Sequence, residues 1–147
     1  QYKFVFTHQV LGTGRGGVEL AGLYEWGGKN QQGVWEFDMM RPDWEMPVHQ
    51  LMVKNGVTIF FHAHDHLFAQ QELDGIIYQS VPNPADPTYT AFNSDAFKSG
   101  QIFPNSGFLN VTVSPDEVKV DYIRAFLPKD QSASQVNGQI AYSYVVK

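Results

Sequence analysis

The chain has 147 residues, 43% of them hydrophobic and 17% charged, which is long enough for one domain with a substantial core. A net charge of −5 with scattered basic residues argues against nucleic acid as a partner, because phosphate backbones are bound by basic faces. Cysteine is absent, so disulfides and thiolate metal sites are excluded and any metal must be held by histidine or by oxygen ligands.

The first half of the chain predicts two strands and two helices. A β-branched and aromatic strand over residues 2–7 precedes His8, and a glycine loop over residues 11–17 leads into a short helix over residues 18–24. Residues 25–33 and 37–45 are predicted as loops. A helix follows that begins at Pro47, runs to Asn55 and stops at Gly56, and residues 57–61 then form a short buried strand.

The second half predicts mainly hairpins. Asp74 and Gly75 separate two strand-like runs, residues 67–73 and 76–81, which is a strong hairpin signal. Residues 82–104 are predicted as a long loop. The remaining predicted strands are residues 107–113, 118–126 and 139–146. The order predicts an α+β fold, with a mixed or antiparallel, β-rich sheet and one or two helices.

Three histidines stand at alternate positions directly after the buried strand, in "HAHDH", residues 62–66. If the strand continued, His62, His64 and His66 would point to one face, since side chains alternate along an extended chain. Neutral imidazoles on one face are natural ligands for a divalent ion. This clustering favours a metal site over a polar strand end.

The spacing separates several metal-binding families. The metallo-β-lactamase pattern H-x-H-x-D-H is one residue longer than the sequence here. The cupin pattern G-x5-H-x-H fits Gly56, His62 and His64, but the glutamate it requires would fall at Phe68 or Ala69. Amidohydrolase barrels need a much longer chain after the histidine pair.

Two stretches, "KFVFTHQ" and "FFHAHDHLFAQQELDGIIYQSVP", resemble the last two metal motifs of the calcineurin-like metallophosphoesterases, the group related to purple acid phosphatases. The family has a strand that ends in a single histidine and a later buried strand that ends in G-H-x-H. The resemblance, nearest to a bacterial subgroup, implies that His8, His64 and His66 are the metal ligands, with Ala63 at the motif glycine. In an alternative register, His62 and His64 form the pair.

The aspartate-bearing motifs of the family's N-terminal half, D-x-H, G-D-x-x-D and G-N-H, do not occur in this sequence. The resemblance therefore implies that residues 1–147 are the C-terminal portion of a four-layer α/β sandwich. We interpret the start at Gln1 as processing, truncation or an arbitrary boundary. No membrane helix is expected, because no apolar run reaches about 18 residues. A periplasmic or secreted location is favoured over the cytoplasm.

The resemblance also implies the chemistry. The complete domain holds two divalent ions (manganese, zinc, iron or magnesium), and a hydroxide held by the metals attacks the phosphorus of a phosphomonoester or diester. We expect this chain alone to bind at most one ion and to be inactive, because the bridging carboxylate is missing. We also expect self-association through an exposed sheet edge.

Three other side chains carry expectations. Arg15 in the glycine loop is a candidate for binding the substrate phosphate. Asp65 is expected to orient an imidazole N–H or to lie at the surface, and His49 to be a helix residue in polar surroundings. Two alternatives remain open: a stand-alone, cupin-like β domain that binds one metal without phosphatase chemistry, and an assembly domain with a vestigial motif.

Overall fold

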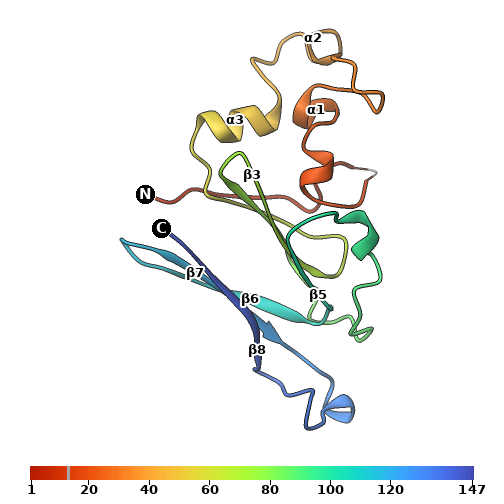
Figure 1. The fold of residues 1–147 in the computed structure, drawn as a ribbon, viewed down its shortest axis with the longest axis vertical. Coiled ribbons are helices and arrows are strands. Elements are labelled where there is room, and N and C mark those ends of the chain that lie inside the picture. Colours follow the sequence, from red (N-terminus) through yellow and green to blue (C-terminus); the bar gives the residue numbers. More distant parts are fainter. Residues whose placement is uncertain (13) are drawn as a thin grey trace.

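Two open sheets and a layer of short helices make up a mixed α/β, β-rich fold (Figure 1). The computed structural model describes residues 1–12 and 14–147. The five-stranded sheet contains β1 (Phe4–Phe6), β2 (Ile59–His62), β4 (Ile76–Ser80), β3 (Phe68–Leu73) and β5 (Gln101–Phe103), in that spatial order. The three-stranded sheet contains β6 (Gly107–Val113), β7 (Val118–Arg124) and β8 (Ile140–Val146). The helices are α1 (Tyr24–Gly27), α2 (Phe37–Met40) and α3 (Val48–Lys54), with short 3₁₀ turns η1 (Val18–Leu20), η2 (Ser94–Ala96) and η3 (Pro128–Asp130).

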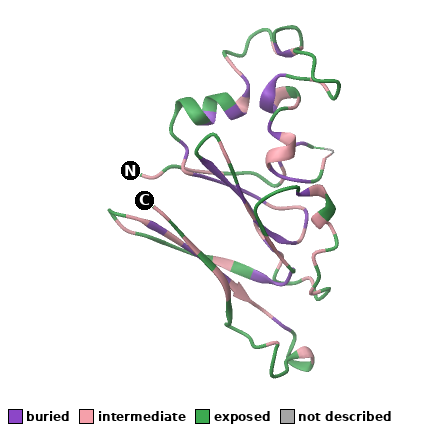
Figure 2. Cartoon of the chain, in the orientation of Figure 1, coloured by how far each residue is buried: buried purple, intermediate pink, exposed green. Residues whose placement is uncertain are grey.

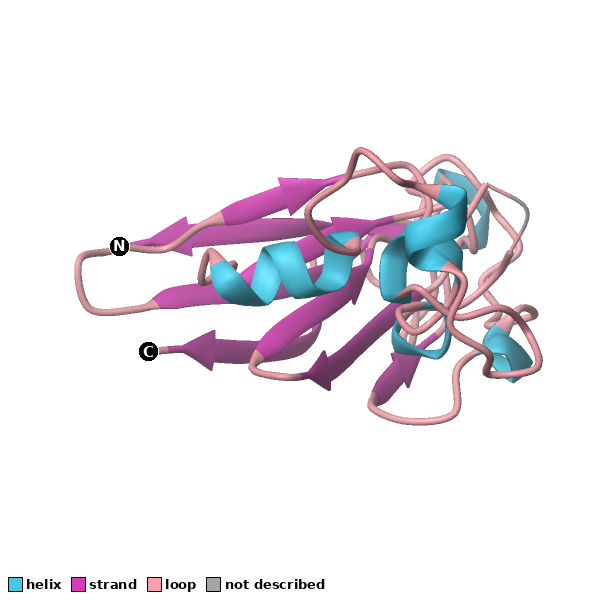
Figure 3. Cartoon of the chain, turned by 90° about the horizontal axis from the view of Figure 1, so that it is seen from above, coloured by secondary structure: helices cyan, strands magenta, loops and turns pink. Residues whose placement is uncertain are grey.

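The five-stranded sheet is parallel at one side and antiparallel at the other. β1 pairs in parallel with β2, and β2 with β4, whereas β3 is antiparallel to both β4 and β5. The long connection from β1 to β2 carries all three α-helices across one face of the sheet, and the three-stranded sheet covers the other face (Figures 1 and 3). The carboxyl ends of β1, β2 and β4 therefore lie at one edge, where ligand sites of open α/β sheets form.

β2 is buried on both faces, as its continuous apolar sequence predicts (Figure 2). Phe60 packs with Trp26 of α1 in the cluster between the helices and the sheet. Ile59 and Phe61 point the opposite way and pack in a second cluster against the three-stranded sheet. The alternation of side chains puts His62 on the same face as Phe60, so the strand buries its last residue too.

The three-stranded sheet is an antiparallel meander with one face in the core. Val118 and Val120 of β7 are fully buried and pack against β2 and β4. Tyr122 follows on the same face and stacks on Phe68 of β3, with ring centroids 5.0 Å apart. Its hydroxyl donates to the carbonyl of Pro104, which ties the start of the meander to the first sheet.

Several expectations are confirmed by these elements. The hairpin around Asp74 and Gly75 is β3–β4, the predicted strands 107–113 and 118–126 are paired as β6 and β7, and the final strand is β8. The helix predicted from Pro47 is α3: Pro47 precedes its first residue, and Gly56 follows it with a left-handed φ of 62°.

Other expectations are wrong. The structure has three α-helices within its described residues, not one or two, because α2 lies in the predicted loop 37–45 and most of α1 lies in the predicted loop 25–33. A helix of one turn has no periodicity to read, and α2 depends on the buried ring of Phe37. The predicted helix 18–24 is only the 3₁₀ turn η1 followed by the start of α1, and β5 lies in the predicted loop 82–104. Of the predicted glycine loop, Thr13 lies outside the described residues.

Candidate functional site

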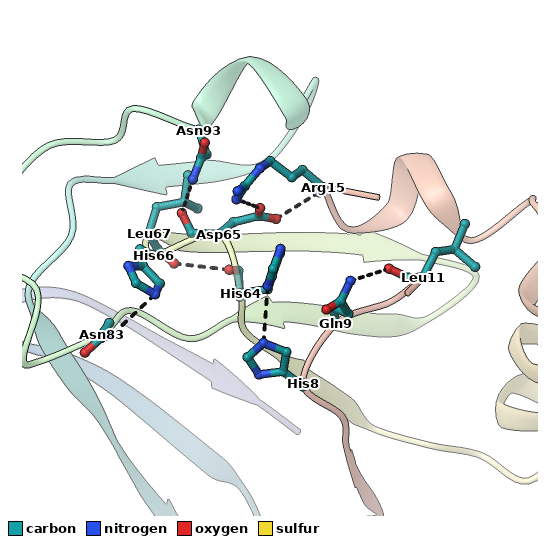
Figure 4. Close-up of polar contacts among 12 residues, drawn as sticks. His8, Gln9, Leu11, Arg15, His64, Asp65, His66, Leu67, Asn83 and Asn93 are labelled. Carbon is teal, nitrogen blue, oxygen red and sulfur yellow. Dashed lines mark hydrogen bonds and ion pairs between the residues drawn. The ribbon is translucent and has the colours of Figure 1, made fainter. Parts of the chain in front are cut away.

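Two histidines from distant parts of the sequence meet at the carboxyl ends of β1 and β2. His8 and His64 each stand two residues beyond the end of their strand. The parallel pairing continues past the strands, because the N–H of Ala63 donates to the carbonyl of His8 at 2.8 Å. As a result, Nε2 of His8 lies 3.2 Å from Nδ1 of His64 (Figure 4).

This separation fits a pair of ligands to one metal ion. Two imidazole nitrogens that each lie about 2.1 Å from a tetrahedral zinc ion are about 3.4 Å apart. The same distance fits a hydrogen bond between the rings when one nitrogen carries a proton and the other does not. His8 is exposed and His64 is half-buried, so solvent and ions can reach the pair. The two rings can therefore supply two neutral nitrogen ligands to a divalent ion.

His66 is on the same loop but has different partners. Its Nδ1 lies 2.6 Å from Oδ2 of Asp86, and its Nε2 lies 3.3 Å from Nδ2 of Asn83. The amide nitrogen of asparagine can only donate, so Nε2 accepts and Nδ1 donates its proton to Asp86. This hydrogen bond from His66 is the main reason that the pKa of the Asp86 carboxyl is lowered. A carboxylate that fixes the tautomer in this manner is common beside histidines that bind metal through the other nitrogen.

The structure thus brings His8 and His64 together and places His66 beside Asp86. Among the residues that the structure describes, no three side chains of histidine, aspartate or glutamate lie close enough to hold one ion. Asp86 and Asn83 were not predicted as residues of the site, because "PNPADP" predicts only irregular structure. Their position after β4 is the available signal, since β4 is the next parallel strand and ends at the same sheet edge.

His62, the member of the alternative register, lies inside the protein. Its residue is 1% exposed, and neither ring nitrogen has a hydrogen-bond partner among the described residues. The ring lies nearly parallel to the rings of Phe60 and Phe97, at centroid distances of 5.6 and 6.4 Å. Burial lowers the pKa of His62 to about 4, so the ring is neutral at pH 7.

Asp65 differs from both expectations for it, because its carboxylate contacts no imidazole and is not at the surface. The residue is 2% exposed. Oδ1 accepts a hydrogen bond from Nη1 of Arg15 at 3.0 Å, and Oδ2 accepts one from the backbone N–H of Gly16 at 2.9 Å. Asp65 therefore joins the glycine loop to residues 63–67, the histidine loop that follows β2, and Arg15 is placed beside the histidines (Figure 4).

The histidine loop leaves the extended conformation directly after β2. His64 and His66 have left-handed φ values of 77° and 50°, which are uncommon for residues with a β-carbon. Ala63 is not among the residues with positive φ, so this backbone does not require glycine at that position. Because the strand ends at His62, the alternation that would point all three histidines to one face stops there.

His49 lies in α3 with both ring nitrogens against polar groups, as expected, but the side chain is buried. Its Nδ1 lies 2.8 Å from the hydroxyl of Tyr78, and its Nε2 lies 2.9 Å from Oδ2 of Asp74. The ring joins α3 to the β3–β4 hairpin, and its residue is 5% exposed. Both nitrogens are occupied by these contacts, which assigns His49 to the packing of the helix on the sheet.

The comparisons with protein families and with curated proteins add no information on the role of these residues. No protein-family model matches the chain, and no curated protein gives a significant match. Within the described residues, none of the helices combines the length and the apolar character needed to cross a membrane.

Proposed function

We propose that this chain is the C-terminal part of a calcineurin-like metallophosphoesterase and that it supplies histidine ligands to a metal site that hydrolyses phosphomonoesters or diesters. One observation carries the proposal: His8 and His64 converge to 3.2 Å from the ends of two neighbouring parallel strands. The resemblance relates the two segments that hold these histidines to consecutive metal motifs. The proposal includes the finer architecture, in which the helices and two sheets form about half of a four-layer sandwich.

The residues have separate roles in this proposal. His8 and His64 bind one ion, and His66 offers Nε2 to a second in place of its hydrogen bond from Asn83, while Asp86 holds its tautomer. Arg15 binds an oxygen of the substrate phosphate. When bound, the ions neutralise phosphate charge and lower the pKa of a water.

The chain alone is proposed to bind at most one ion and to turn over phosphate esters poorly. Two imidazoles bring no negative charge to a dication, and a two-metal site needs carboxylates that balance its charge. In the family, these carboxylates come from motifs that this sequence does not contain.

The topology favours this proposal over the cupin-like alternative. Cupins are antiparallel double-sheet jelly rolls. Here β1, β2 and β4 are parallel to one another, and the helices lie in the connection between two of these strands. A parallel sheet with its candidate site at the carboxyl edge is the arrangement expected of an α/β enzyme.

A metal titration with a double-mutant cycle tests the proposal. Wild type, His8→Ala, His64→Ala and the double variant are titrated with Zn²⁺ by calorimetry and with Co²⁺ by visible absorption. If both rings bind one ion, each single variant loses about 10-fold or more in affinity and the double variant loses little further. Equal zinc affinity in wild type and His8→Ala would overturn the proposed pair.

A phosphatase assay tests the expected inactivity. The chain is incubated with p-nitrophenyl phosphate and Mn²⁺ or Zn²⁺, and His62→Phe serves as the control because it removes a histidine that lies in the interior. Turnover near the background rate is expected for every variant. Robust turnover by the wild-type chain that is lost in His64→Ala contradicts the expected inactivity of the chain alone.

A further inference from the structure

Asp65 connects three segments that are far apart in the sequence. Its carboxylate accepts hydrogen bonds from Arg15 and from the N–H of Gly16, in the glycine loop. Its backbone carbonyl accepts a third, from Nδ2 of Asn93 at 2.8 Å. A buried carboxylate whose two oxygens are both bonded to one loop fixes that loop firmly, because breaking either bond leaves a charge without its partner. We call these four residues the Asp65 clamp.

The clamp acts on a strained part of the backbone. Asp65 stands between His64 and His66, and both histidines have left-handed φ values. Residues with a β-carbon hold this conformation only where surrounding contacts enforce it. Three hydrogen bonds hold Asp65, the residue between the two histidines, and the clamp therefore restrains the backbone on both sides of it.

The clamp also sets the position of Arg15. The Arg15 side chain is 48% exposed, and one of its nitrogens is held by Asp65. Within residues 1–12 and 14–147, its other side-chain nitrogens have no hydrogen-bond partner, so most of its five N–H donors are available to a ligand. Gly16 next to it has a φ of 114°, and a β-carbon there would lie 2.9 Å from the carbonyl oxygen of Ala96. The loop is therefore closely packed at the residue that follows the arginine.

We propose that Asp65 is a positioning residue of the proposed metal site, and that it holds Arg15 as the docking group for a phosphoryl anion beside the His8–His64 pair. The inference rests on the proposed function for the role of that pair. The buried carboxylate holds Nη1 of the guanidinium, and the N–H donors that it leaves free can bind phosphate oxygens in the planar geometry that suits them. Loop geometry and anion binding thus depend on one residue that touches neither metal nor substrate.

Two binding measurements separate the roles in the clamp. The variants Asp65→Asn and Arg15→Ala are titrated with Zn²⁺ and, separately, with inorganic phosphate at saturating Zn²⁺. We expect Asp65→Asn to weaken both affinities, zinc by about 10-fold, as for other residues that support metal ligands. We expect Arg15→Ala to weaken phosphate binding most, and zinc binding only by the smaller amount that follows from the loss of one clamp bond. The matched controls are Asp116→Asn, an exposed aspartate in the β6–β7 turn, and Arg41→Ala, and both should leave both affinities unchanged.

The outcomes that overturn the inference are specific. Unchanged zinc affinity in Asp65→Asn removes the positioning role, and unchanged phosphate affinity in Arg15→Ala removes the docking role. Asparagine keeps an oxygen that can accept from the N–H of Gly16, so we expect the variant to fold, which thermal unfolding checks. If it does not fold, Asn93→Ala removes one clamp bond while it leaves the ion pair intact, and a smaller loss of zinc affinity is then expected. Zinc affinity equal to wild type in that variant overturns the positioning role.

If the proposed metal-binding function is wrong, the affinity measurements give a different pattern. If zinc affinity is the same in wild type, His8→Ala and His64→Ala, then the metal pair is wrong, whatever Asp65 does. The clamp is then judged by amide hydrogen exchange and by phosphate binding without metal. Faster exchange at residues 14–17 and 63–67 in Asp65→Asn, but not in Asp116→Asn, supports the clamp as a device that orders the loop. Equal exchange rates in both variants overturn it.

Discussion

The ring of His62 lies almost parallel to the ring of Phe60, two residues earlier in β2, with 18° between the ring planes. The two side chains share the helix-facing side of the sheet, where Phe60 is surrounded by apolar groups, and neither ring nitrogen of His62 has a hydrogen-bond partner in the part of the chain that the structure describes. A buried polar group without a hydrogen bond lowers stability. His62 is thus a histidine in the position of a core aromatic residue.

Replacement of His62 by phenylalanine should therefore stabilise the protein. We expect the free energy of unfolding at pH 7.5 to rise by about 1 kcal/mol, since an unsatisfied polar group is removed from the core. Urea denaturation measures this change. His49→Phe is the matched control, because both nitrogens of that buried ring are bonded, and it should lower stability by about 1–3 kcal/mol. Zinc affinity should not change in His62→Phe, and its loss would support the register with His62 and His64 as the metal pair.

The regular elements of the fold follow from local signals. The backbone preferences of Asp74-Gly75 favour a hairpin turn. Those of the proline and glycine that flank α3 favour the start and the end of a helix. α2 and β5 could not be predicted, because one is a single turn and the other has three residues, and both depend on tertiary packing. The meeting of His8 and His64 requires that two neighbouring parallel strands end at one sheet edge, and the sequence indicates only that each histidine follows a strand.

The other contacts of the site could not be predicted from the sequence, because they depend on how distant loops meet. The alternation of the three histidines assumes a strand, and the backbone turns left-handed at His64. The partners of Asp65 and His66 lie on loops tens of residues away, and no local pattern connects them. A carboxylate between two histidines suggests an imidazole partner. In the structure, the Asp65 carboxylate is instead bonded to Arg15 and Gly16 of the glycine loop.

Gly28 occupies a position where two requirements coincide. Its φ is 83° at the end of α1, and a β-carbon there would lie 2.2 Å from the ring of Trp35. Gly33 has a similar φ of 80° but has no atom within 4 Å of such a β-carbon. An alanine at position 33 would therefore introduce backbone strain alone, whereas an alanine at position 28 would introduce both backbone strain and steric overlap.

We expect Gly33→Ala to cost about 1 kcal/mol in unfolding free energy, the usual penalty for a left-handed alanine. Gly28→Ala should cost about 1–3 kcal/mol more, because the indole of Trp35 must move. Denaturant unfolding gives the two energies, and the indole N–H signal of Trp35, which donates to Asp38, should shift only in Gly28→Ala. Equal costs for the two substitutions would mean that the indole moves freely.

The carboxylate of Asp121 should make the stability of the three-stranded sheet depend on pH at acidic values. Its carboxylate accepts hydrogen bonds from Nζ of Lys119, at 3.0 Å, and from the hydroxyl of Ser143 of β8. These contacts, with Lys119 the largest cause, hold the pKa of the Asp121 carboxyl below its ordinary value of 3.8. The unfolded chain then binds this proton more readily than the folded protein, so the contribution to stability is complete above about pH 4 and is lost as pH falls through the lower, folded-state pKa.

Asp121→Asn should accordingly lower stability by about 1 kcal/mol at pH 6, since a hydrogen bond to a charged group is lost. The difference from wild type should shrink as the pH falls below 4, where the wild-type carboxylate becomes protonated. Thermal unfolding from pH 6 to pH 2.5 measures both effects. The exposed Asp116→Asn should run parallel to wild type throughout. A difference between Asp121→Asn and wild type that stays constant with pH would contradict the assigned pKa shift.

The outer edge of β1 is proposed as the route of self-association. β1 is the first strand of its sheet and pairs on one side only, with β2. Phe6 at its end is 69% exposed, although its ring stacks on Phe61 at 4.9 Å. An open strand edge with an exposed aromatic side chain can pair with the same edge of a second copy, and a lysine at such an edge opposes that pairing.

We therefore expect the wild-type chain to form dimers or larger species at high protein concentration, and Phe6→Lys to remain monomeric at the same concentration. Multi-angle light scattering over a concentration series measures this difference. Met39→Lys is the matched control, because Met39 is equally exposed, at 71%, but lies in α2, away from any strand edge. Suppression of association by Met39→Lys but not by Phe6→Lys would assign the contact to the helical layer instead. A wild-type chain that stays monomeric throughout would remove the edge as an interface.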